Sequence, residues 1–386
     1  MKILILNPVI IKNTVQRIIP FGIGYICAYL KYKGIHFDFI DANINKLSYY
    51  DILKSIESEK YDLIMSGGMH VVYNWLKGLI YEIRRINPNT KIVIGGALAS
   101  SVPDMAISDM GADIAVIGEG EMTCYEIIEC LMNKENVAKV AGIAYKENGF
   151  IRFTERRNLI TDINSMPPID YEMFNLKEYL KFGWQLISSR GCPFDCKFCY
   201  RIFGKTIRFR DLNTIVDEIE KYQQKYGFEY VWMIDELSLM KKERLLSFCD
   251  ILNERRIKIK WAFAMRANQA DEFALECALN AGCVRLYIGF ESGSQKILDN
   301  INKKITVKQM EDGVSRILKA GFENQMIDGS LMVGSPGETP ETVQESIDFV
   351  KRNNLFVYST HIVTPFPGSR LFEEMFSSDK FKTEDK

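Results

Sequence analysis

Short apolar runs alternate with longer segments of helical spacing over the first 140 residues. The apolar runs predict five buried strands, at 2–7, 37–42, 61–68, 91–97 and 113–121. Between them, apolar residues recur at intervals of three and four, which predicts helices at 22–34, 50–60, 75–87 and 121–133. Strands that alternate with helices in this way form βαβ units. Residues 1–140 therefore predict a doubly wound, Rossmann-like domain built around a parallel sheet.

A second alternating series begins at residue 184. Residues 141–183 predict a connector, with a hairpin-like stretch at 144–158 and a proline-marked break at 165–170. Six further apolar runs predict strands at 184–191, 230–236, 259–268, 284–292, 326–334 and 358–366. Helical patterns follow at 212–226, 241–254, 271–281, 306–319 and 339–353. Six βα units in succession predict a partial (β/α)6 barrel of the TIM type over 184–386.

Composition narrows the class of protein. The chain has 386 residues, 47% of them apolar and 26% charged, with a formal net charge of −1, which is typical of a soluble globular protein. There is no basic field to suggest a nucleic-acid partner. No window reaches the roughly 18–20 apolar residues that a membrane span needs. The nine cysteines are an odd number without a secretory signal, so we expect reduced thiols and a cytoplasmic location.

Glycine or a small polar residue ends almost every predicted strand of the first domain. Asn7 ends the first strand, glycine pairs end the third and fourth at 67–68 and 95–96, and Gly118 and Gly120 follow in the fifth. In open α/β sheets, ligands bind beyond the carboxyl ends of the strands, where glycine lets the backbone approach a large ligand. We therefore expect a ligand site along this edge.

Three cysteines, Cys192, Cys196 and Cys199, lie in the stretch GCPFDCKFCY, directly after the first predicted barrel strand. A closed zinc site needs a fourth ligand, and the three histidines of the chain are distant in sequence. Cys196 and Cys199 also have the spacing of a redox pair. A [4Fe-4S] cluster fits best, because three thiolates would leave one iron open for another ligand. The carboxyl end of a barrel strand is where chemistry is expected.

The cysteine spacing, with the aromatic Phe198 just before the last cysteine, resembles the signature of radical S-adenosylmethionine (SAM) enzymes. The resemblance extends over 184–376 through IDE (234–236), GFESGSQ (289–295) and GSLMVGSPGET (329–339). It implies that the three cysteines hold the cluster. It implies that Arg266 binds the carboxylate of SAM, and Arg285 is a second candidate for that contact. The SAM-binding residues that the resemblance implies are Phe198, Asp235, Glu236, Arg266, Glu291, Ser292, Gly334 and Pro336.

The first domain resembles the cobalamin-binding domain that precedes many radical SAM enzymes. The resemblance lies in PFGIGYICAYLKYKG (20–34), VIGGALAS (93–100) and VIGEGEM (116–122). The Asp-x-His-x-x-Gly motif that gives cobalt a histidine in other cobalamin proteins is absent, and many members of this subset lack it. The cobalamin contacts that the resemblance implies are Asn7, Gly24, Ser66, Gly67, Gly68, His70, Gly95, Gly96, Gly118, Glu119, Gly120 and Glu121.

Together the two resemblances imply an anaerobic enzyme with a [4Fe-4S] cluster, SAM and cobalamin. They imply a class B-like methyltransferase, in which a 5′-deoxyadenosyl radical activates an unreactive carbon and methylcobalamin supplies the methyl group. The expected partners are a small-molecule or natural-product substrate and an electron donor such as flavodoxin or ferredoxin, with no nucleic acid and no membrane.

Three alternatives stay open from the sequence. The enzyme could cyclise or rearrange a tetrapyrrole or natural-product precursor without methylating it. The chain could be a radical SAM enzyme whose first domain has lost cobalamin and binds another ligand or a protein substrate. The chain could also be a corrinoid carrier or sensor without turnover.

Overall fold

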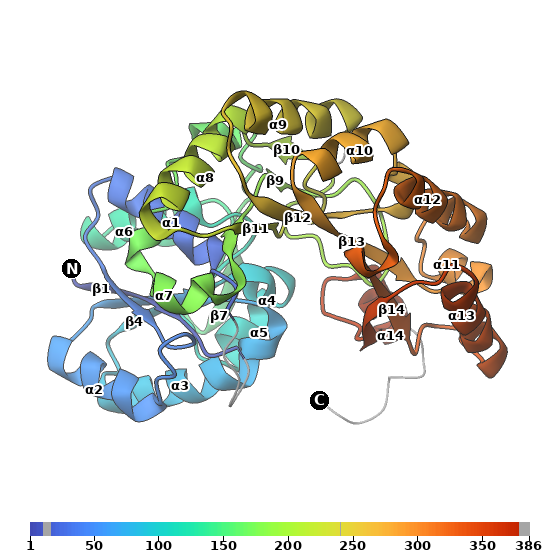
Figure 1. Cartoon of the computed structure of the whole chain (residues 1–386). Helices are drawn as coiled ribbons and strands as arrows, with labels where there is room; N and C mark the ends of the chain where they lie inside the picture. The colour runs from blue at the N-terminus through green and yellow to red at the C-terminus, as the bar shows by residue number, and fades with distance from the viewer. Residues whose placement is uncertain (11–16, 240, 378–386) are drawn as a thin grey trace. The chain divides into compact units, whose positions relative to one another are not determined.

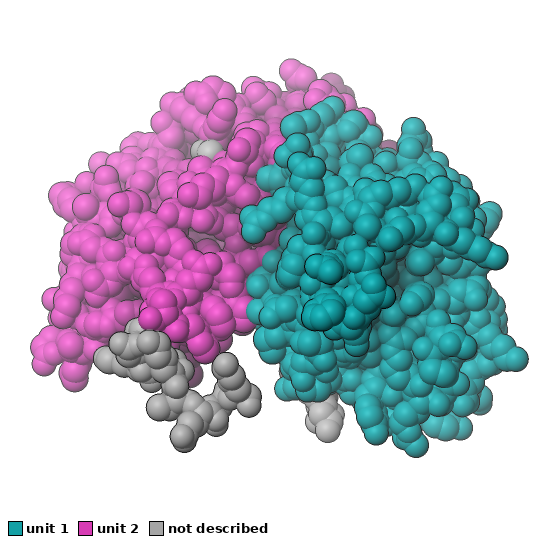
Figure 2. Space-filling view, turned by 180° about the vertical axis from the view of Figure 1, so that it is seen from behind, with its two compact units in different colours: residues 1–181 teal, residues 182–386 magenta. Residues whose placement is uncertain are grey.

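The chain forms two compact units in the computed structural model, which describes residues 1–10, 17–239 and 241–377. Unit 1 is Met1–Lys181 and unit 2 is Phe182–Lys386. Figure 1 traces the elements of each unit, and Figure 2 colours the two units separately. Within the described ranges, no helix has both the length and the apolar character that crossing a bilayer requires.

Unit 1 is built on a seven-stranded sheet with the strand order β2-β1-β3-β4-β5-β6-β7. The first five strands pair in parallel, as predicted, and β6 and β7 add an antiparallel end. The strands are β1 (Ile3–Asn7), β2 (Asp38–Asp41), β3 (Leu63–Gly67), β4 (Lys91–Gly95), β5 (Ile114–Val116), β6 (Ile143–Glu147) and β7 (Phe150–Phe153).

Helices cover both faces of this sheet, which confirms the doubly wound architecture. One face packs against α1 and α6 through Cys27, Leu30 and Ile127. The other packs against α2 and α3 through Ile52, Leu79 and their neighbours. The alternation of side chains along each strand supplies both cores. The helices are α1 (Phe21–Tyr32), α2 (Tyr49–Glu59), α3 (Tyr73–Ile86), α4 (Gly96–Ser101), α5 (Pro103–Ser108) and α6 (Glu121–Met132).

The segment predicted as a connector belongs to unit 1. Its hairpin joins the sheet, because β6 pairs with β5 and buries Ile143 and Ala144. Asn148 and Gly149 make the hairpin turn with φ of 50° and 85°, a pairing typical of two-residue turns. Farther along, α7 (Leu176–Tyr179) ends at a buried tyrosine whose hydroxyl donates to Asp41 Oδ2 at 2.6 Å. These contacts explain why unit 1 reaches residue 181.

Unit 2 carries the predicted open barrel. Its main sheet has the order β15-β14-β13-β12-β11-β8, and all its pairs are parallel. In Figure 1, α8, α9, α10, α12 and α13 follow one another along the outside of this sheet. The main-sheet strands are β8 (Trp184–Leu186), β11 (Tyr230–Met233), β12 (Lys260–Met265), β13 (Cys283–Glu291), β14 (Ile327–Val333) and β15 (Val357–Ile362). The helices are α8 (Leu212–Tyr226), α9 (Lys242–Glu254), α10 (Glu272–Asn280), α11 (Gln295–Asn300), α12 (Val307–Lys319), α13 (Pro340–Arg352) and α14 (Arg370–Phe376).

The first predicted barrel strand is shorter than the sequence indicates. After β8 the chain leaves the main sheet, and β9 (Ser189–Arg190) pairs instead with β10 (Arg208–Phe209) in a two-stranded antiparallel ribbon. The buried Asp235 carboxylate holds the chain at this point, accepting a 2.7 Å hydrogen bond from the main-chain nitrogen of Ser188. The cysteine loop therefore starts from the ribbon, just beyond the carboxyl end of β8.

Candidate functional site

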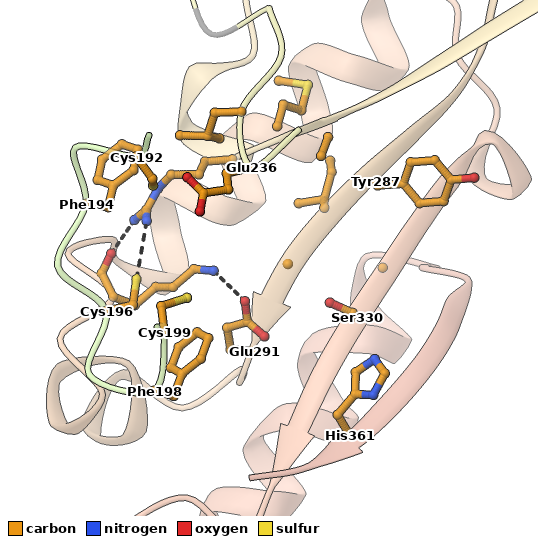
Figure 3. Close-up of a pocket in the computed structure, with 18 of the residues that line it drawn as sticks. Cys192, Phe194, Cys196, Phe198, Cys199, Glu236, Tyr287, Glu291, Ser330 and His361 are labelled. Carbon is orange, nitrogen blue, oxygen red and sulfur yellow. Dashed lines mark hydrogen bonds and ion pairs between the residues drawn. The ribbon is translucent and has the colours of Figure 1, made fainter. Parts of the chain in front are cut away.

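A cavity of about 480 Å³ lies within unit 2, and all three clustered cysteines line it. The cysteine loop forms one side of this cavity. Side chains on β11 to β15 and in the loops between them form the rest, including Trp232, Tyr287, Ser330 and His361. In Figure 3 the cysteines gather on one side, and Tyr287, Ser330 and His361 lie opposite them. The fold thus places the predicted cluster ligands at one end of a single ligand-sized cavity.

Backbone and side-chain contacts fix the cysteine loop from two directions. The main-chain nitrogen of Lys197 donates to Ile301 O at 2.9 Å, and its carbonyl accepts from the nitrogen of Leu371 at 2.8 Å. The Asp195 carboxylate accepts hydrogen bonds from Arg201 and Arg370. Arg370 and Leu371 begin α14, so the last described helix of the chain braces the loop that carries the cysteines.

Glu291 and Lys303 form a buried ion pair on the cavity wall. Lys303 Nζ lies 2.7 Å from Glu291 Oε1, and the two side chains are 7% and 11% exposed. Glu291 ends β13 with φ of +67°, a strained conformation for a residue with a Cβ atom. A Cβ on Gly289 would lie 2.4 Å from Glu291 Oε1, so any larger residue there would displace this carboxylate. The sequence reading missed Lys303, because it lies in a loop with no motif around it.

The structure divides the predicted SAM-binding residues into two groups. The residues that line the cavity are Phe198, Glu236, Arg266 and Glu291. Those outside its lining are Asp235, Ser292, Gly334 and Pro336. Asp235 is fully engaged in holding the chain after β8, where it also accepts from the hydroxyls of Ser188 and Ser189. Ser292 is buried, and its hydroxyl lies 3.0 Å from Ser346 Oγ. The Pro336 carbonyl accepts from Asn300 at 2.9 Å.

The end of the cavity away from the cysteines combines aromatic rings with a few polar groups. The ring centroids of Trp232 and Tyr287 are 5.6 Å apart. Tyr287 also shares a hydroxyl hydrogen bond with Tyr230, and burial raises the pKa of both phenols, so both stay neutral. At the same end, the buried Asp328 carboxylate accepts from Arg285 at 3.1 and 2.9 Å. The sequence analysis named only Arg285 of this group, as a second candidate for the SAM carboxylate, and its ion pair with Asp328 joins two different strands.

In unit 1 the predicted glycines meet at the carboxyl edge of the sheet, where most of them serve close packing. A Cβ on Gly67 would lie 2.4 Å from Gly95 O, and one on Gly96 would lie 2.7 Å from Gly68 O. Gly118 differs, because its φ is +87° and no heavy atom lies within 4 Å of the position of a Cβ. Gly118 therefore leaves an open space at this edge.

Several other predicted cobalamin contacts have partners within unit 1. Asn7 donates to Asp41 at 2.8 Å, and the Ser66 hydroxyl donates to Leu6 O at 2.8 Å. His70 Nε2 lies 2.6 Å from Ser101 Oγ, and Glu119 accepts from the main-chain nitrogen of Ile160 at 2.8 Å. Gly24 and Gly120 pack against other side chains, and Glu121 is buried at the start of α6. These residues shape the edge, and their contact with cobalamin stays a prediction.

Two known domain families match the chain. Residues 8–128 match the B12 binding domain, and residues 186–350 match the Radical SAM superfamily. The chain belongs to the radical SAM enzymes that carry a cobalamin-binding domain. In this cobalamin-dependent radical SAM enzyme, the first match lies in unit 1 and the second lies in unit 2, which holds the cysteine-lined cavity.

Curated relatives of this radical SAM enzyme include proteins with different reactions. It is 28% identical to the "Uncharacterized methyltransferase PH0819" of Pyrococcus horikoshii, over 99% of this chain and 85% of the relative. It is 26% identical to the anaerobic magnesium-protoporphyrin IX monomethyl ester cyclase of Cereibacter sphaeroides, over 92% of this chain. The chain spans 60% of the length of that cyclase.

Solved structures share the fold over nearly the whole chain. The methyltransferase TsrM from Kitasatospora setae, solved with cobalamin and a [4Fe-4S] cluster, matches with a TM-score of 0.81 at 17% identity, covering 97% of this chain and 74% of TsrM. The cobalamin-dependent enzyme OxsB matches with a TM-score of 0.80 at 20% identity, covering 98% of this chain and 56% of OxsB. At these identities the likeness concerns the fold.

The donor set of the cavity fits the [4Fe-4S] cluster that the family carries. Among the described residues, no three cysteine, histidine or acidic side chains converge on one point where a single ion could bind. A four-iron cluster bonds each thiolate to a different iron, so its ligands need not converge on one point. Burial raises the pKa of the Cys192 thiol, so cluster binding must release its proton.

The cofactors supply electron transfer, SAM cleavage and a carrier for a methyl group. The described residues of unit 2 contribute the walls around that chemistry. The ring of Phe198 lines the cavity between Cys196 and Cys199, and the Glu291–Lys303 pair presents a fixed acid and base on the wall. The aromatic rings of Trp232 and Tyr287 give the far end an apolar wall.

Proposed function

We propose that this enzyme methylates an unactivated carbon of a small molecule, with cobalamin as the methyl carrier. One observation carries the proposal: a B12 binding domain and a radical SAM domain share one chain, and the relative aligned over 99% of that chain is named a methyltransferase. The solved TsrM structures support it, since one of them contains tryptophan as its substrate.

Within the cavity we assign the cluster to Cys192, Cys196 and Cys199, and we assign SAM to the wall that Glu291 and Phe198 form. A carboxylate such as Glu291 accepts hydrogen bonds from hydroxyl groups, which suits the ribose of SAM. The substrate would then lie toward Trp232 and Tyr287. Aromatic rings at that end favour a substrate with a flat ring that stacks on them.

Anaerobic reconstitution with iron and sulfide, followed by cobalamin titration and incubation with methyl-deuterated SAM, tests this function. We expect one cobalamin to bind per chain. With a low-potential reductant, which supplies the electrons that bring cobalamin to the nucleophilic Co(I) state, the labelled methyl group should appear on cobalamin, with S-adenosylhomocysteine as the co-product. The same reductant should reduce the cluster and yield 5′-deoxyadenosine. Absence of cobalamin binding at full iron content would rule out the proposed function.

Ring formation is the second candidate, because cyclases of magnesium-protoporphyrin are among the relatives. The same assay separates the two functions. A cyclase forms 5′-deoxyadenosine after reduction and does not transfer the labelled methyl group to cobalamin. A corrinoid carrier without turnover forms neither product.

We also propose an electron donor and a cellular location for this enzyme. A reduced flavodoxin or ferredoxin would supply the electron for SAM cleavage. The cytoplasm would keep the cysteines of the chain free of disulfides.

Gly118 gives a test of the proposed cobalamin edge. Replacing Gly118 or Gly34 with Ala places a Cβ at φ of +87° or +75°, and neither position has a heavy atom within 4 Å. We expect both variants to lose about 1–2 kcal/mol of unfolding free energy, from backbone strain alone. Only Gly118→Ala should weaken cobalamin binding, by at least about tenfold, since Gly34 precedes β2 at the opposite edge of the sheet. Equal cobalamin affinities in the two variants, measured by titration, would place cobalamin elsewhere.

A further inference from the structure

Arg266 connects the cysteine loop to a second loop of the cavity. Arg266 comes directly after β12 in the chain, and it is only 6% exposed. Nη1 lies 3.9 Å from the sulfur of Cys196, and Nη2 donates to the main-chain oxygens of Lys303 and Lys304. Figure 3 marks the contact between this guanidinium and Cys196. One buried cation therefore contacts both a predicted cluster ligand and the loop that carries Lys303.

Phe194 strengthens this link to the cysteine loop. The guanidinium carbon of Arg266 lies 3.9 Å from the centroid of the Phe194 ring, within the range of a cation–π interaction. Phe194 is two residues before Cys196. Stacking on the ring and the contact with sulfur thus hold the same segment of the loop, and they fix the plane of the guanidinium.

The same contacts make Arg266 a poor clamp for the SAM carboxylate, the role that the sequence suggested for it. A guanidinium binds a carboxylate through two parallel N–H groups, either those of Nη1 and Nη2 or those of Nε and Nη2. Both pairs include Nη2. Nη2 already donates to two carbonyl oxygens. Nε is buried and has no hydrogen-bond partner among the described residues. The N–H of Nε and the second N–H of Nη1 stay available, but these two groups are not parallel and cannot bind one carboxylate as a pair.

We propose that Arg266 is a positioning residue for the cluster, which holds Cys196 and raises the reduction potential. Reduction adds one negative charge to the cluster, and a nearby cation with an N–H directed at a ligand sulfur stabilises the reduced form. Hydrogen bonds to sulfur and net charge are two of the main determinants of iron–sulfur potentials. The inference does not rest on methyl transfer, since a cluster potential is measured without cobalamin or substrate.

Arg285 provides a matched control. It also lies on a strand of the main sheet, β13, and carries the same charge. Its guanidinium is paired with the Asp328 carboxylate at the far end of the cavity, at 2.9 Å. Replacing Arg285 therefore removes a cation from the same unit and leaves the cysteine loop intact.

The test is a redox titration of the reconstituted [4Fe-4S] protein without SAM, followed by electron paramagnetic resonance. Iron content and thermal melting are measured alongside. We expect Arg266→Gln to shift the midpoint potential to a more negative value. Arg266→Lys keeps the charge and loses the planar stack, so it should give a smaller shift in the same direction. Arg285→Gln should match the parent protein. A fully loaded Arg266→Gln protein with the parent potential overturns the proposal.

Phe194→Leu keeps the test decisive if the Arg266 variants lose the cluster. This variant retains Arg266 and all three cysteines and removes only the stacking ring. We expect it to load iron and to show a small negative shift. If the Arg266 variants lack the cluster and Phe194→Leu has the midpoint potential of the parent protein, Arg266 does not raise the reduction potential. A weaker SAM affinity in Arg266→Gln at unchanged potential would assign the residue to SAM instead.

Discussion

The geometry of the cavity predicts that replacing Cys196 with Ala abolishes the iron–sulfur cluster and SAM cleavage. Cys196 is one of the three proposed cluster ligands, which line the cavity from a single short loop, and two cysteines cannot hold a four-iron cube in the same way. The apo protein should lose little stability, because the loop stays fixed by Lys197 and Asp195 through contacts that do not involve sulfur. Iron content, visible absorption and 5′-deoxyadenosine yield measure the effect.

Cys130→Ala is the matched control for this experiment. Cys130 is 1% exposed and packs against the sheet in unit 1. Its replacement should cost about 1 kcal/mol of unfolding free energy, through lost packing, and leave iron loading unchanged. If Cys196→Ala retained its cluster while Cys130→Ala lost it, the assignment of the cluster ligands would be wrong.

Replacing Lys303 with Met destabilises unit 2 more than replacing any exposed lysine. Glu291 would stay buried at φ of +67° without the one ion-pair partner that it has among the described residues, and removing one member of a buried ion pair costs about 3–5 kcal/mol. We also expect SAM cleavage to fall by at least about tenfold, because the Glu291 carboxylate would move from its position on the cavity wall. Urea unfolding and 5′-deoxyadenosine yield provide the two measurements.

Lys308→Met tests whether burial causes this effect. Lys308 forms a pair with Asp312 at 2.6 Å, but its side chain is 77% exposed, so solvent screens the interaction and the loss should be small. In the double variant Glu291→Gln/Lys303→Met no buried charge remains unpaired. It should recover much of the stability and none of the SAM cleavage. Equal losses in the Lys303 and Lys308 variants would contradict the buried-pair explanation.

The periodicity of apolar residues was sufficient to predict the architecture of both units. The parallel strands of both units appear within the apolar runs that predicted them, although β8 is shorter than its run, because a parallel sheet covered on both faces buries apolar strands. The sequence predicted a hairpin at β6 and β7 but did not place it in the sheet. Its turn residues, Asn148 and Gly149, marked a hairpin, but pairing with β5 depends on an open sheet edge that no local pattern reports.

The sequence by itself determined the two alternating domains, the grouping of three cysteines on one loop and the glycine-rich edge, because each depends on residues close together along the chain. The tertiary structure alone decided which distant groups meet. It joined Lys303 to Glu291 and Arg266 to Cys196, and it turned Asp235 toward Ser188 and out of the cavity lining. These contacts arise from the curvature of the sheet and the path of its loops. Their energies depend on burial and distance, which spacing along a chain does not specify.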